Sequence, residues 1–304
     1  MAQPSPPADS VPLSVVIATR DRTAMLDNCL TLLGAAMPKP AEIVVVDTAS
    51  PDDATAQVAA AHGAVYLRLD SPGVCHARNV GWQMATNDLI AFIDDDVRVY
   101  PGWAGAMAQA FDEDGVDFVT GWIGIPPGQE EAQDPQPLMV EMDARRLDRS
   151  TREHMGASAN MGARRAALEQ VGGFDERLGP ATWFSASEDH DLFDRLVLAG
   201  CVGSYRPDVG VDHEAWRGRR ARLRQHWRYG KGTGARIRLL MQRDRARAAR
   251  EARELLWRHA AVEAAVRLRQ RWKMGFACSV LRLAGGLLGF AVALVTIRAP
   301  WPVG

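Results

Sequence analysis

Cysteine is scarce in this 304-residue sequence. The four cysteines, Cys29, Cys75, Cys201 and Cys278, include no Cys-x-x-Cys pair. Neither a disulfide framework nor a structural zinc site is indicated, and a reducing compartment fits best. Residues 1–10 have no basic start and no apolar run, which excludes a secretory signal, and their Pro and Ser content predicts a disordered lead-in. With 47% hydrophobic and 24% charged residues, the composition is that of a globular protein.

The sequence has almost no net charge, because its 36 Lys and Arg residues nearly balance its 37 Asp and Glu residues. The balance hides an asymmetry: residues 1–213 carry 15 basic and 32 acidic side chains, whereas residues 214–273 carry 19 and 5. An acidic front is suited to divalent cations, and a basic segment is suited to phosphates or anionic lipid. The basic segment lacks zinc-finger spacing and RNA-binding aromatic signatures, so no nucleic-acid partner is expected.

Apolar runs alternate with helical patterns in the first hundred residues. Short buried strands are predicted at Leu13–Thr19, Ile43–Val46, Ala64–Leu67 and Leu89–Ile93. This alternation predicts an α/β fold with a parallel, doubly wound sheet, in which ligands bind at the carboxyl ends of the strands. Further on, we expect a strand at 117–121, a flexible loop over the site within 125–152, and a strand pair at 201–212.

Acidic residues follow three of the predicted strands. Asp21 and Asp47 each follow one strand, and either could be a helix N-cap. That explanation fails for Asp94 to Asp96, because only one of three adjacent aspartates can cap a helix. Adjacent carboxylates raise the pKa of at least one of them unless a cation neutralises them. The triplet is therefore a candidate for presenting Mg²⁺ or Mn²⁺ to a diphosphate.

Three other features have two open interpretations each. Glu188 and Asp189 begin a predicted helix, where acids complement the helix dipole or one of them acts as a general base. His213 is either a structural histidine or a ligand. The small residues of 156–168 either form a plain turn before a helix or let the backbone approach a ligand.

Six motifs in order carry a resemblance to a known family. They are S-V-V-I-A-T-R-D-R, I-V-V-V-D-T-A-S, R-N-V-G-W-Q-M-A, A-F-I-D-D-D-V, S-A-N-M-G-A-R-R and S-E-D-H-D-L. Together they resemble the family 2 glycosyltransferases of the GT-A fold over about residues 11–215. The resemblance implies a Rossmann-like, mostly parallel sheet and an inverting enzyme. Such an enzyme moves a sugar from a nucleotide diphosphate, most often UDP, to an acceptor hydroxyl with the help of Mn²⁺ or Mg²⁺.

The resemblance also implies roles for individual residues. Asp189 is expected to be the catalytic base with Glu188 beside it, and Asp96, Asp94 and His213 are expected to hold the metal. The residues expected to bind the nucleotide sugar are Thr19, Arg20, Asp21, Asp47, Arg78, Asp94, Asp95 and Asn160. Thr48 stands where many members have a second acid, so the identity of the nucleotide stays open.

The C-terminal part predicts a membrane-associated enzyme. Residues 216–273 form a basic helical region, and 274–298 form a hydrophobic helix whose only charge before Ile297 is Arg282. This helix could span a bilayer, lie in its interface, or be buried in the fold or in a homodimer. We expect a location on the cytoplasmic face of the cell membrane. A lipid-linked or saccharide acceptor, in surface polysaccharide or glycolipid assembly, is expected.

Two rival functions fit parts of the sequence. A sugar nucleotidyltransferase should carry a Gly-rich basic loop after the first strand, where this chain has only Thr19 to Arg22. A non-catalytic scaffold that binds nucleotide sugars or lipid would not need the acids at 94–96 and 188–189.

Overall fold

The computed structural model describes residues 9–113, 115–129, 139–152, 154–214, 219–257 and 273–299. The chain divides into two compact units, which are described separately. The first comprises residues 1–174, 192–215 and 303–304, and the second comprises 175–191 and 216–302. Most of the expected lead-in lies outside the described residues, as do parts of the expected loop within 125–152 and of the basic region 216–273.

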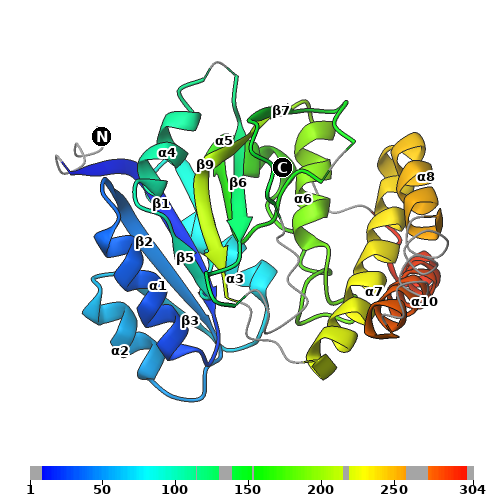
Figure 1. Cartoon of the computed structure of the whole chain (residues 1–304), viewed down its shortest axis with the longest axis horizontal. Helices are drawn as coiled ribbons and strands as arrows, with labels where there is room; N and C mark the ends of the chain where they lie inside the picture. The colour runs from blue at the N-terminus through cyan, green and yellow to red at the C-terminus, as the bar shows by residue number, and fades with distance from the viewer. Residues whose placement is uncertain are drawn as a thin grey trace. The chain divides into compact units, whose positions relative to one another are not determined.

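The first unit is built on one mixed sheet (Figure 1). Its order is β3-β2-β1-β4-β8-β6-β9-β5, with β7 beside β9. Among the described residues, six strands run in one direction, and β5, β7 and β8 run in the other. The expected α/β fold with a mostly parallel sheet is therefore confirmed. The strands are β1 Ser10–Thr19, β2 Lys39–Thr48, β3 Val65–Leu69, β4 Leu89–Asp94, β5 Val97–Val99, β6 Phe118–Gly124, β7 Arg145–Leu147, β8 Asn160–Arg164 and β9 Gly203–His213.

Helices connect the parallel strands. Right-handed crossovers place α1 and α2 on one face of the sheet and α3 on the other, because the chain reverses its direction of travel between β3 and β4. Apolar side chains from both faces of β1, β2 and β4 form a continuous buried core with these helices. The helices of this unit are α1 Thr23–Ala35, α2 Ala54–Ala61, α3 Val74–Met84, α4 Trp103–Ala110 and α5 Arg165–Val171, followed by α6 Glu188–Leu198, which begins in the second unit.

Two local expectations are wrong. The strand pair expected at 201–212 is one long strand, β9, which pairs with β6 through a register shift. Part of the small-residue stretch at 156–168 forms β8, a central antiparallel strand rather than a turn. Glycine and alanine have low strand propensity, so the pattern did not indicate a strand. Packing explains the glycine, because a Cβ atom at Gly162 would lie 2.6 Å from the sulfur of Met107.

The N-cap interpretations of Asp21 and Asp47 are not supported. Arg22 occupies the N-cap position of α1 and Asp53 that of α2, and neither side chain caps its helix. The acids at these two strand ends are therefore free of a capping role. The backbone N–H of Asp21 donates to the Ser50 hydroxyl at 2.8 Å, and the partners of Asp47 are described below.

The second unit contains the basic helices and the expected hydrophobic helix. Its described helices after residue 216 include α7 Arg219–Arg243, α8 Arg245–Glu254 and α10 Lys273–Thr296. Glycines let α7 and α10 approach closely: a Cβ atom at Gly285 would lie 2.5 Å from the carbonyl oxygen of Trp227. A small core of this unit comprises Leu178, Phe184, Ala235, Leu239, Ala293 and Ile297.

The contact between α3 and the sheet yields a first prediction. A Cβ atom at Gly81 would collide with the side chain of Val16 on β1, so Gly81→Ala should lower the free energy of unfolding by about 1–3 kcal/mol. Gly34→Ala on α1 is the matched control. No atom lies within 4 Å of its added Cβ, so it should stabilise the protein by about 0.5–1 kcal/mol through helix propensity. Chemical denaturation of both variants checks the opposite signs, and equal effects would contradict this packing.

Candidate functional site

The site lies where the chain changes direction within the sheet. Strands β1 and β4 are neighbours, yet the connections β1–β2 and β3–β4 run toward opposite edges. Such a switch point leaves a crevice at the carboxyl ends of the two strands, where α/β proteins bind ligands. Thr19 ends β1 and Arg20 to Arg22 follow it, while Asp94 ends β4 and Asp95 and Asp96 follow it. The topology thus brings these two sequence motifs together.

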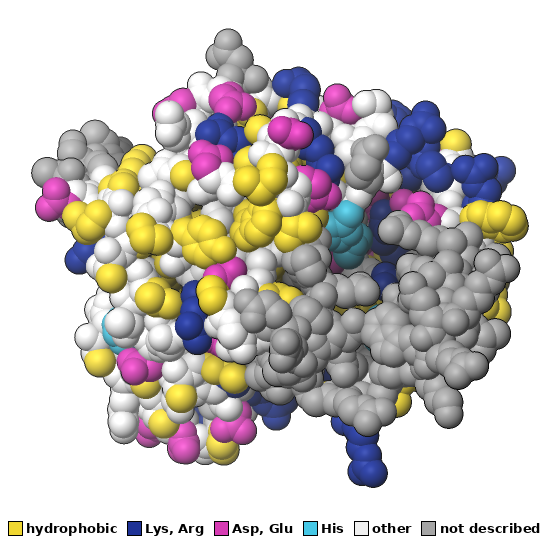
Figure 2. Space-filling view, viewed as in Figure 1, with side chains coloured by type: hydrophobic (Ala, Val, Ile, Leu, Met, Phe, Trp, Pro, Cys, Tyr) yellow, Lys and Arg dark blue, Asp and Glu magenta, His cyan; other side chains and the backbone are white. Residues whose placement is uncertain are grey.

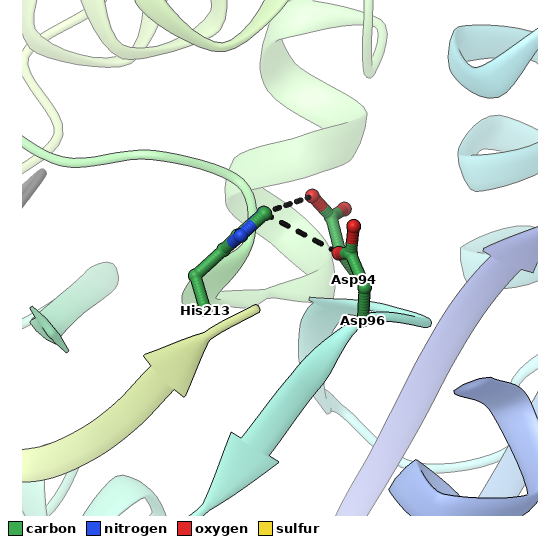
Figure 3. A group of neighbouring side chains, drawn as sticks. All are labelled: Asp94, Asp96 and His213. Carbon is green, nitrogen blue, oxygen red and sulfur yellow. Dashed lines mark ion pairs between the residues drawn. The ribbon is translucent and has the colours of Figure 1, made fainter. Parts of the chain in front are cut away.

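Asp94, Asp96 and His213 converge in this crevice (Figure 3). Asp94 ends β4, and Asp96 lies in the turn before β5. His213 is the last residue of β9 and pairs with Val97 of β5. Nε2 of His213 lies 3.3 Å from Oδ1 of Asp96 and 3.8 Å from Oδ2 of Asp94. One potential ligand atom from each residue lies within 4.8 Å of the others. Two carboxylates and an imidazole fit a divalent cation such as Mn²⁺ or Mg²⁺.

Each of the three aspartates has a basic side chain close to it, and two of these side chains are shared between aspartates. Nη2 of Arg78 donates to Asp94 at 2.7 Å, and Nη1 of Arg22 donates to Asp95 at 2.8 Å. The remaining oxygen of Asp95 accepts from the Thr19 hydroxyl at 2.6 Å. The third aspartate, Asp96, faces His213 and also lies 3.4 Å from Arg22. The triplet is therefore held by charges from several elements, in agreement with the argument from charge density.

These neighbours affect the aspartates differently. Burial raises the pKa of Asp95 to about 6, although Arg22 and the Thr19 hydroxyl oppose the rise. Burial acts in the same direction on Asp94, but His213 and Arg78 more than offset it and hold the pKa of Asp94 well below its usual range. Asp94 is therefore a carboxylate near neutral pH, which is the form that binds a metal.

The R-N-V-G motif on α3 positions Arg78. The side chain of Asn79 accepts from the backbone N–H of Phe174 at 2.8 Å and donates to its carbonyl at 2.9 Å. The Phe174 ring lies under the guanidinium of Arg78, at 5.3 Å from its centroid. The motif therefore fixes Arg78 against Asp94, with only 4% of the arginine side chain exposed.

Two residues that were expected to bind the donor have internal partners instead. Asp47 is fully buried; one oxygen accepts from the Ser50 N–H and the other from the Tyr66 hydroxyl. Asn160 is fully buried as well, and its amide bonds to Trp103 and to the carbonyl oxygens of Trp122 and Val209. Neither side chain has surface to offer a ligand. Asp47 thus orders the turn after β2 through Ser50, and Asn160 links α4 to β6 and β9.

The expected catalytic acids lie in the second unit. Glu188 and Asp189 are in the first turn of α6. Oδ1 of Asp189 accepts from the backbone N–H of His190 at 2.7 Å and lies 2.8 Å from the Nδ1 atom of the same histidine. Two residues on, the buried Asp191 accepts from Arg243 at 2.7 Å. Asp189 thus has an imidazole partner that holds its orientation.

Sequence reasoning missed two residues of the crevice. Arg22 contacts Asp95 and Asp96, although Arg20 was the arginine singled out; Arg20 is exposed. Glu214 follows β9, and its backbone N–H donates to the carbonyl of Asp96 at 3.0 Å. Arg22 could have been found from its position. It lies directly before α1, at the carboxyl end of β1, and β1 is the neighbour of β4 in the sheet. Nothing in the local pattern distinguished Glu214.

The fold is that of an α/β protein with three potential metal ligands at the switch point of its sheet. The sequence matches the model of the Glycosyl transferase family 2 over residues 14–172, and the chain belongs to this family. The chain is 29% identical to the pre-mycofactocin glycosyltransferase of Mycobacterium tuberculosis over 225 residues, which is 70% of this chain and 45% of that protein. It therefore spans about half the length of that relative. It is 25% identical to the glycosyltransferase AglE of Haloferax volcanii, over 72% of both chains.

Solved structures support the fold. Staphylococcus aureus TarS, residues 1–349 in complex with UDP-GlcNAc, superposes with a TM-score of 0.61 at 17% identity, covering 94% of this chain and 91% of that one. The mannosyltransferase PcManGT of Pyrobaculum calidifontis, in complex with GDP-Man and Mn²⁺, gives a TM-score of 0.58 at 17% identity, covering 97% and 90%. These likenesses confirm the expected GT-A fold.

The cation site yields a second prediction. Asp96→Asn removes a ligand charge, so the affinity for Mn²⁺ should fall by at least about 10- to 100-fold, the loss seen even for outer-shell partners. Titration of free Mn²⁺ by electron paramagnetic resonance measures this directly. Asp112→Asn, a change of the same kind at an exposed acid outside the crevice, should bind Mn²⁺ like the wild type. Equal affinities in all three proteins would show that Asp96 is no ligand.

Proposed function

We propose that this protein is an inverting, metal-dependent glycosyltransferase that moves a sugar from a UDP-sugar to an acceptor hydroxyl. The single observation that carries the proposal is the convergence of Asp94, Asp96 and His213 at the switch point of a family 2 sheet. The UDP preference is supported by TarS, which was solved with UDP-GlcNAc, and opposed by PcManGT, which was solved with GDP-Man.

The donor site is assigned to the crevice of the first unit. A divalent cation held by Asp94, Asp96 and His213 would supply the positive charge that a diphosphate leaving group needs. Arg20 and Asp21, which are exposed directly after β1, are the proposed direct contacts to the nucleotide. Thr19, Arg22 and Arg78 hold the aspartates in place. Asp47 orders the loop after β2 through Ser50.

The base is assigned to Asp189. A single displacement at the anomeric carbon needs one group that accepts the proton of the acceptor hydroxyl. A carboxylate oriented by a histidine is suited to that step, and Asp189 contacts His190 at 2.8 Å. Glu188, the preceding residue in the first turn of α6, is proposed to support the site without accepting the proton.

The proposed location is the cytoplasmic face of the membrane, with a lipid-linked or saccharide acceptor and a role in surface polysaccharide or glycolipid assembly. By length and composition, Gly275–Thr296 could cross a membrane, and 33% of its most apolar window is buried within the protein. The exposed remainder includes Leu294 and Val295, at 49% and 71% exposure. We propose that this outer face of α10 lies in the membrane interface, while its glycine face packs on α7.

The base assignment yields a third prediction. Asp189→Asn should lower kcat by about 10²- to 10⁴-fold, because the proton acceptor is lost. Binding of UDP with Mn²⁺ should be unchanged, since the proposed donor contacts belong to other residues. Glu188→Gln should retain most activity. The opposite outcome, an inactive Glu188→Gln beside an active Asp189→Asn, would exchange the two roles.

The membrane assignment yields a fourth prediction. Leu294→Glu/Val295→Glu places charges on the exposed face of α10 without touching its packed face. Co-sedimentation with vesicles containing phosphatidylglycerol should fall at least about tenfold, because burial of each apolar side chain is worth about 1.5–3 kcal/mol. Met142→Glu, at a residue 75% exposed in the first unit, is the control and should sediment like the wild type. If vesicle binding is unchanged but a wild-type dimer dissociates, the face is a homodimer interface.

A further inference from the structure

The second unit contains a cavity of about 970 Å³ among α7, α8 and α10. This volume is at the upper end of the range of small-molecule sites, roughly 300–1,000 Å³. Ten of its fourteen described lining residues are apolar, and they include Ile237, Met241, Leu255, Leu287 and Phe290. An open apolar space of this size favours a hydrocarbon ligand over a polar one.

The polar lining residues lie close together in the sequence. Arg238, Gln242, Arg243 and Arg245 belong to the end of α7 and the start of α8, and no acidic side chain lines the cavity among the described residues. One anionic neighbour lies close by, since Asp191 accepts from Nη1 of Arg243. The two remaining arginines, Arg238 and Arg245, have no such counter-ion among the described residues. This end of the cavity is therefore positively charged.

Three buried polar atoms of this end have no hydrogen-bond partner in the described part of the chain. They are Nε of Arg238, Nη2 of Arg243 and Oε1 of Gln242. Because these three atoms are shielded from solvent, a ligand in the cavity would meet the remaining guanidinium nitrogens of Arg238 and Arg243, and those of Arg245. A phosphate offers the acceptor geometry that guanidinium groups bind best.

We infer that this cavity binds a phosphate carried on a long hydrocarbon chain. The chain would cover the apolar walls, and the phosphate would accept from Arg238, Arg243 and Arg245. Free phosphate would leave the apolar walls in water, and an uncharged lipid would leave the arginine donors unsatisfied. In Figure 2, dark-blue basic and yellow hydrophobic side chains lie side by side over α8. The inference rests on the proposed function, because a lipid-linked acceptor of that enzyme would carry such a phosphate, and the binding test below needs no sugar transfer.

Calorimetric titration of the full chain with dodecyl phosphate, below its critical micelle concentration, tests the inference. Saturable binding of one molecule per chain is expected, with inorganic phosphate and dodecyl maltoside each at least about tenfold weaker. No saturable binding of dodecyl phosphate, or equal binding of all three probes, would overturn the inference. Lauroyl lysophosphatidylglycerol and farnesyl phosphate then distinguish the source of the ligand, a phospholipid or a phosphorylated isoprenoid, by which of them binds more tightly.

Matched variants separate a specific site from general basic charge. Arg238→Gln/Arg245→Gln should weaken binding of dodecyl phosphate at least about tenfold. Arg224→Gln/Arg228→Gln removes the same charge from exposed positions of α7 outside the cavity and should change binding less than about twofold. Ala249→Trp, at an exposed alanine of the cavity wall, should block binding by filling the space. Equal losses in both arginine pairs, or normal binding by Ala249→Trp, would contradict the site. An unchanged far-UV circular dichroism spectrum and thermal unfolding midpoint show that each variant is folded.

Discussion

Three adjacent carboxylates at the end of one buried strand impose the main constraint on the first unit. Asp95 and Asp96 are each 3% exposed, so water cannot screen their mutual repulsion. The fold meets this constraint with basic neighbours from three elements: Arg78 from α3, Arg22 from the loop after β1, and His213 from β9. Because the neighbours come from separate elements, the site forms only when β1, β4 and β9 are correctly placed in the sheet.

The packing of α3 holds Arg78, one of the basic neighbours of the aspartates, in position. Gly81 lets the helix contact Val16 and Val46. The side chain of Asn79 bonds to both the backbone N–H and the carbonyl oxygen of Phe174. Neither residue touches the crevice, yet together they set the position of Arg78, whose side chain must reach Asp94 while almost fully buried. In this motif, Arg78 therefore acts through its charge, whereas Asn79 and Gly81 act by fixing the position of the helix. A buried ion pair of this kind stabilises only when its geometry is fixed, which the two packing residues provide.

Much of this could be predicted from the sequence, and the failures have physical reasons. Apolar strands that end in aspartates predicted the sheet and the convergence of Asp94 to Asp96 with the end of β1, since parallel strands end at one edge. Strand β8 was missed because close packing against Met107, not strand propensity, selects Gly162. Asp47 was correctly placed at a strand end, but its burial depends on Tyr66 of the next strand, a cross-strand neighbour that no local pattern reveals.

The position of the hydrophobic helix, α10, also depends on contacts that no local sequence pattern reveals. Its apolar composition fits a spanning helix, but its glycine face packs on α7, with Gly289 close to the carbonyl of Lys231. A spanning α10 would take Arg228 and Lys231 of α7 into the hydrocarbon, at about 2.5–3.5 kcal/mol per charge near the centre. An interfacial position avoids that cost, because the basic side chains stay among headgroups while the outer leucines enter the acyl boundary. The pairing of the two helices, which hydropathy alone does not show, therefore favours a helix that lies on the membrane.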